Sequence, residues 1–83
     1  MDVQAFERQA RSGTVDAVNI LSHEGDIYTA EVVIHGRSHT LESTDRHQPL
    51  VFHSYREAKR SFASYSVPIR LEASQVYDEM ISH

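Results

Sequence analysis

Three histidines are the first candidates for chemistry, as ligands of a metal ion. His35 and His39 flank Gly36-Arg37, a pair that favours a tight turn, and His23 stands near the end of an earlier β-like stretch. Imidazole nitrogens suit zinc, which takes four N, S or O ligands in structural sites and three protein ligands in catalytic ones. The H-x-x-x-H spacing falls on a turn, however, and HExxH does not occur. Exposed hairpin histidines are the alternative interpretation, and no cofactor is predicted.

Basic side chains are a second candidate, for contact with phosphate or nucleic acid: Arg46, Arg56, Lys59 and Arg60. On a predicted helix, Lys59 and Arg60 follow Arg56 by three and four residues, and a helix N-terminus attracts phosphate oxygens. Tyr55 and Tyr65 would be available for stacking, yet they share the apolar side of that helix and are more typical of a core. A net charge of −4 and the lack of tryptophan argue against a dedicated nucleic-acid-binding protein.

Catalysis is a third candidate, because His53, Ser54 and Glu57 superficially offer a base and a nucleophile. A capping box explains two of them better. The Ser54 hydroxyl accepts a hydrogen bond from the Glu57 backbone N–H at a helix start, and the Glu57 side chain reaches back. The chain has no G-x-S-x-G elbow, and with three glycines it lacks a phosphate-binding glycine loop. We therefore predict no enzymatic activity.

The elements that must position these residues follow from hydrophobic periodicity. The capped helix carries Tyr55, Ala58, Phe62 and Tyr65 on one side, so its basic residues face away from the core. Strand-like alternation occurs on both sides of it in the sequence. The pattern predicts helices at 2–11, 54–65 and 75–81, strands at 15–23, 27–35, 38–42, 50–52 and 67–72, and a surface loop at 43–49.

That order, α-β-β-β-β-α-β-α, predicts an α+β fold in which a small antiparallel β-meander is covered by helices on one face. At 83 residues the chain fits one domain, residues 1–83, with a small core. It has no cysteine, which excludes disulfides and thiolate ligands and favours a reducing cytoplasm. The N-terminus does not resemble a signal peptide, and the longest apolar run, Val32-Val33-Ile34, is far too short to span a bilayer.

Several short motifs together carry a resemblance to a known family. They are Glu24-Gly25-Asp26-Ile27-Tyr28, His53-Ser54-Tyr55-Arg56-Glu57-Ala58, Pro68-Ile69-Arg70-Leu71 and Val76-Tyr77-Asp78-Glu79-Met80. The chain resembles, over nearly its whole length, a domain-of-unknown-function family of short proteins from Pseudomonas-like gammaproteobacteria. The resemblance implies a bacterial, cytoplasmic, stand-alone domain, and it brings no catalytic residues.

We therefore predict an accessory or regulatory protein-interaction module without catalysis, a homodimer being one form of it. A sheet covered on one face leaves its other face and its edges available to a partner. Outward positions such as Thr29, Glu31 and Val33 mix polar and apolar character. The segment 76–81 is acidic and amphipathic, and it suits docking on its own domain or in a partner's groove. Phosphate or nucleic-acid binding and histidine-based metal binding remain the alternatives.

Overall fold

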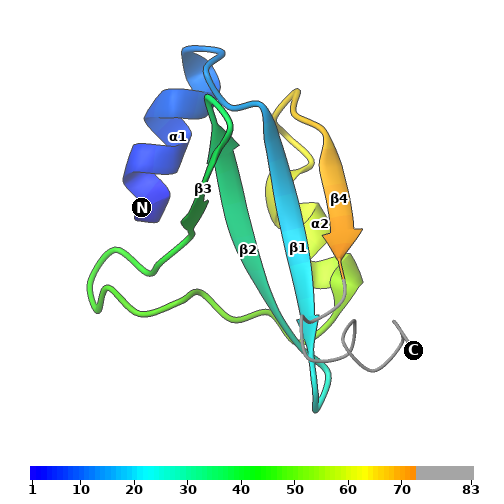
Figure 1. The fold of residues 1–83 in the computed structure, drawn as a ribbon. Coiled ribbons are helices and arrows are strands. Elements are labelled where there is room, and N and C mark those ends of the chain that lie inside the picture. The colour runs from blue at the N-terminus through cyan, green and yellow to red at the C-terminus, as the bar shows by residue number, and fades with distance from the viewer. Residues whose placement is uncertain (73–83) are drawn as a thin grey trace.

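The computed structural model describes residues 1–72, which form two helices and one four-stranded sheet (Figure 1). In chain order the elements are α1 (Val3–Arg11), β1 (Ala17–His23), β2 (Ile27–Ile34), β3 (Arg37–Thr40), α2 (Tyr55–Phe62) and β4 (Ile69–Glu72). The predicted α+β fold is confirmed. The predicted helix at 75–81 lies outside the described residues.

The sheet is mixed, which corrects the prediction of a wholly antiparallel meander. Its strand order is β3-β2-β1-β4; β1, β2 and β3 are antiparallel neighbours, whereas β4 pairs with β1 in parallel. The reason lies in the path of the chain. Residue Phe52, just before α2, bridges to Tyr28 at the end of the sheet where β1 finishes, and β4 begins with Ile69 beside Val18, where β1 starts. The chain therefore enters β4 in the direction of β1.

The predicted fourth strand at 50–52 does not form as a strand. Phe52 makes one isolated bridge to Tyr28, through two backbone hydrogen bonds of 2.9 and 2.8 Å, and Val51 is 44% exposed. β3 already pairs with the β2 residues from Glu31 to Ile34, so the incoming chain meets only the remaining end of that edge. The order within residues 1–72 is thus α-β-β-β-α-β.

Both helices cover the same face of the sheet, as predicted. The side chains of Val18, Ile20, Ala30 and Val32 on β1 and β2 are fully buried. On the helix side, Phe6 of α1 meets Phe62 of α2 edge-to-face, with ring centroids 5.4 Å apart. Figure 1 shows α2 lying behind β1 and β4 and α1 beside β3. The opposite face of the sheet carries no helix among the described residues.

Candidate functional site

α2 presents three cations on the side that faces away from the core. The helix begins at Tyr55, directly after its N-cap Ser54. The Ser54 backbone is extended, and its side-chain hydroxyl oxygen accepts a hydrogen bond from the Glu57 backbone N–H at 3.0 Å, so half of the predicted capping box is confirmed. Ala58 and Phe62 are the buried residues of the helix, since the sheet packs against that side. The helical repeat then leaves the other side in solvent. We call the exposed residues Arg56, Lys59 and Arg60 the basic face of α2.

Two shallow hollows flank the Arg56–Arg60 ridge of this face. The first, about 450 Å³, is lined by Ser54, Glu57 and Ser61 together with the two arginines. The second, about 360 Å³, is lined by the same arginines with Tyr55, Lys59 and Ala63. Hydroxyl and charged groups supply about half of the lining of the first hollow. The tyrosine ring, the alanine methyl and the long aliphatic stems make the second apolar.

The charge of the basic face is positive although the chain as a whole is acidic. It holds three cations, with one carboxylate, Glu57, beside them in the first turn. Among residues 1–72 none of the three cations forms an ion pair. The Lys59 ammonium instead lies over the Tyr55 ring, 5.9 Å from its centroid, an arrangement in which the ring's negative face attracts the cation. Guanidinium and ammonium groups are the side chains that pair with carboxylates and phosphates in proteins.

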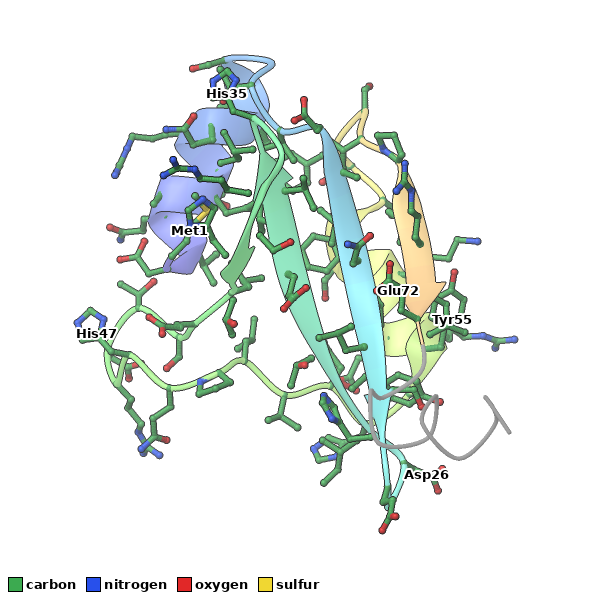
Figure 2. The ribbon with its side chains drawn as sticks, in the orientation of Figure 1. Met1, Asp26, His35, His47, Tyr55 and Glu72 are labelled. Carbon is green, nitrogen blue, oxygen red and sulfur yellow. The ribbon has the colours of Figure 1, made fainter. Side chains whose placement is uncertain are left out.

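Arg46, predicted to act with these residues, lies in a different part of the molecule. Its loop folds back on itself through hydrogen bonds between Ser43 and Gln48 and between His47 and Ser43. Glu42, at the base of the loop, bridges to Asp2 beside the start of α1. Figure 2 shows His47 and Tyr55 on opposite sides of the protein. The structure therefore groups Arg56, Lys59 and Arg60 and leaves Arg46 apart.

The three histidines predicted as metal ligands are not brought together either. His23 ends β1, whereas His35 follows the end of β2 that pairs with the start of β1. About seven residues of strand separate these ends, or roughly 23 Å at 3.3 Å per residue. Figure 2 shows His35 at one end of the sheet and Asp26, in the turn after His23, at the other. Within residues 1–72 no three histidine or carboxylate side chains are grouped as metal ligands would be.

Each histidine has a local structural setting instead. The His23 ring nitrogen Nε2 lies 2.8 Å from the Thr29 hydroxyl on the neighbouring strand. His35 has a positive φ of 53°, as has Gly36 at 79°; two such residues between paired Ile34 and Arg37 form a type I′ hairpin turn. His39 is exposed on β3, opposite Val32.

One buried polar residue, Asn19, was missed by the reasoning from sequence. It lies on the helix-free face of the sheet, is 8% exposed, and its Oδ1 accepts no hydrogen bond from residues 1–72. The strand registers place it in a polar row across four strands: Thr40, Glu31, Asn19 and Arg70. A polar residue between Val18 and Ile20 was the available signal. The same face carries Thr29, Glu31 and Val33, all of them partly buried.

A hydrogen bond ties α1 to the segment after α2. The Tyr65 hydroxyl donates to Glu7 Oε2 at 3.2 Å, and the Tyr65 ring packs edge-to-face on Phe6 with centroids 5.1 Å apart. Burial raises the pKa of Tyr65 above 10.0, and the Glu7 carboxylate raises it further through its charge and its hydrogen bond, against a smaller opposing effect of Arg11. This contact helps to fix the end of α2 relative to α1.

Three comparisons with known proteins complete the description. The model of the Family of unknown function (DUF6482) matches residues 1–83. No curated protein and no solved structure matches the chain. Among the described residues, neither helix has the length and apolar character needed to cross a bilayer.

Proposed function

Since the chain belongs to the Family of unknown function (DUF6482), which carries no assigned activity, we propose a function from its own surface. The protein is a non-catalytic interaction module that binds an acidic segment of a partner protein through the basic face of α2. The observation that carries this proposal is the grouping of Arg56, Lys59 and Arg60 in solvent on one helix, beside an apolar hollow at Tyr55 and Ala63.

A protein partner fits this surface better than a nucleic acid. The net charge of −4 repels a long polyanion, whose binding depends on many phosphate contacts. Exposed charges more than about 10 Å away are screened at 0.1 M salt, so a short acidic peptide meets mainly the local positive charge. A phosphate group would make no favourable contact with the apolar hollow, whereas an aliphatic or aromatic side chain next to a carboxylate would fill it. Peptides can carry carboxylates and apolar side chains at neighbouring positions.

The proposal is tested with a short fluorescein-labelled random copolymer of glutamate and tyrosine in a 4:1 ratio. Fluorescence anisotropy would measure its binding to the full chain, with polyglutamate and a single-stranded DNA oligonucleotide of matched length as parallel probes. We expect the glutamate–tyrosine copolymer to bind most tightly. Binding should weaken with salt because the carboxylate contacts are screened, and it should retain a part that salt does not remove because of the apolar contact.

Charge reversal on the basic face supplies the decisive comparison. The variant Arg56→Glu plus Arg60→Glu should weaken copolymer binding about tenfold or more, which corresponds to about 1.4 kcal/mol. The matched control, Arg8→Glu plus Arg37→Glu, makes the same change in net charge at two other exposed arginines. Equal affinities of the two variants would overturn the proposal. Binding of the oligonucleotide but not of the copolymer would replace it with the phosphate-binding alternative.

The setting of this module is part of the same proposal. We propose that it acts as a single domain, residues 1–83, in the cytoplasm of a gammaproteobacterium. The absence of cysteine supports a reducing compartment, and the resemblance of the short motifs to proteins of Pseudomonas-like gammaproteobacteria supports the origin. A homodimer is one form the interaction would take. The short edge strand β4, whose Leu71 is 53% exposed, offers a surface for it. Sedimentation as a monomer at high concentration would contradict the dimer.

A further inference from the structure

The chain itself contains a segment whose chemistry matches the basic face of α2. Residues 76–81 read Val-Tyr-Asp-Glu-Met-Ile, two adjacent carboxylates between apolar side chains. The face offers three cations next to an apolar hollow. These six residues therefore combine the two kinds of group, carboxylate and apolar side chain, that the proposed partner must present.

The described part of the chain finishes at the end of the sheet where α2 begins. β4 finishes at Glu72, which pairs with Leu21 near the end of β1. α2 begins at the same end of the sheet, because Phe52 bridges to Tyr28 and Tyr28 pairs with Ser22. α2 also packs directly against β4. Figure 2 labels Glu72 and Tyr55 beside the point where β4 ends.

The length of chain that follows Glu72 is sufficient. An extended chain spans up to about 3.3–3.6 Å per residue, so the six residues from 73 to Asp78 cover about 20 Å. A helix with its side chains is about 10–12 Å across. An extended chain after Glu72 is therefore long enough to bring Asp78 and Glu79 to the outer side of α2.

We propose that residues 76–81 dock on the basic face of α2 in the same chain. Asp78 and Glu79 pair with the cations, and their apolar neighbours enter the hollow at Tyr55 and Ala63. As regulation of a binding site, the inference rests on the proposed function, because the segment then competes with the acidic partner for one surface. A partner must displace it, and the partner's apparent dissociation constant is the intrinsic one divided by the fraction of chains that are uncovered.

Zero-length cross-linking by a carbodiimide tests the docking directly. The chain has one lysine, Lys59, so an amide between a lysine and a carboxylate has a single possible amine. We expect peptide mass spectrometry of the full chain to show Lys59 joined to Asp78 or Glu79. The N-terminal amine of Met1, 3.9 Å from Glu42 Oε1, supplies a positive control within the same molecule. A mixture of ¹⁵N-labelled and unlabelled protein separates links within a chain from links between chains.

Three results would overturn the inference. One is a Met1–Glu42 link without any link from Lys59 to the segment. Another is a link from Lys59 to Asp45, in the distant loop, that is as abundant as the links to Asp78 and Glu79. The third is a link found only between labelled and unlabelled copies, which would make a second copy of the chain the occupant.

A binding measurement separates this inference from the proposed function. In the full chain, Asp78→Asn plus Glu79→Gln should tighten copolymer binding about threefold if the segment covers the face two-thirds of the time. The control Asp45→Asn plus Glu24→Gln makes the same charge change at other exposed positions. It should leave the affinity for the copolymer unchanged. Copolymer binding that depends on Arg56 and Arg60, with no Lys59 link, overturns the docking and leaves the function standing. The Lys59 link without copolymer binding overturns the proposed function and leaves the docking standing.

Discussion

The edge-to-face contact between Phe6 and Phe62 should stabilise the packing of α2 against α1. A double-mutant cycle would measure the coupling energy of this pair. The two rings lie 5.4 Å apart at 87° and each residue is 2% exposed. The variants are Phe6→Leu, Phe62→Leu and the two together. Leucine keeps most of the apolar burial but has no ring, so the cycle isolates the aromatic pair from the loss of a buried side chain.

The expected magnitudes follow from the contacts of each ring. Phe6 also packs on Tyr65, and Phe62 also packs on Phe52 with centroids 6.0 Å apart. Each single variant should therefore lose about 1.5 kcal/mol of unfolding free energy, the combined effect of changed volume and lost ring contacts. The coupling energy of the pair should be about 0.5–1.5 kcal/mol. A domain of this size has roughly 4–12 kcal/mol of stability, so the double variant should still fold.

Urea unfolding followed by circular dichroism would give these free energies. With a slope of about 1 kcal/mol per molar urea, each single variant should shift the midpoint down by about 1.5 M. Phe6→Leu combined with Leu71→Ala serves as the additive control, because Leu71 is 53% exposed at the edge of the sheet. A double variant of Phe6 and Phe62 whose loss equals the sum of the singles within about 0.3 kcal/mol would refute the reasoning.

Three further outcomes are expected. Ser54→Ala should lower the unfolding free energy measured in urea by about 1 kcal/mol, because the Glu57 N–H loses its acceptor. Ser54→Asp should keep the cap while weakening copolymer binding. Equal losses of unfolding free energy in the two variants would exclude a capping role. The pKa of Tyr65 is raised above 10.0, so its contribution to stability is complete below pH 10 and disappears as pH rises through the higher folded-state pKa; wild type should lose stability above pH 10 relative to Tyr65→Phe, and parallel pH curves would contradict this. Gly36→Ala, at a φ of 79°, should lower the unfolding temperature by about 4–8 °C and His35→Asn should not, and an unchanged temperature for Gly36→Ala would rule out the type I′ turn as a constraint.

Features set by neighbouring residues were predictable from the sequence. The N-cap at Ser54, the buried side of α2 and the strands around the Gly25 and Gly36 turns all depend on residues a few positions apart. The pairing of β4 with β1 and the single bridge at Phe52 depend instead on which sheet edge is still free when the chain returns. Local alternation cannot distinguish a parallel from an antiparallel neighbour, because side chains alternate with the same period in both.

The same distinction explains what was predictable about the site. Arg56, Lys59 and Arg60 belong to one helix, so its repeat alone places them together. Arg46 and the three histidines belong to separate parts of the chain. They could be grouped only if the fold brought those parts together, and it does not. The row of Thr40, Glu31, Asn19 and Arg70 shows the opposite case, because four strands contribute to it. A shift of one residue in any strand would turn that strand's side chain to the other face. Such a surface exists only through the register of the whole sheet, and no pattern within one strand contains it.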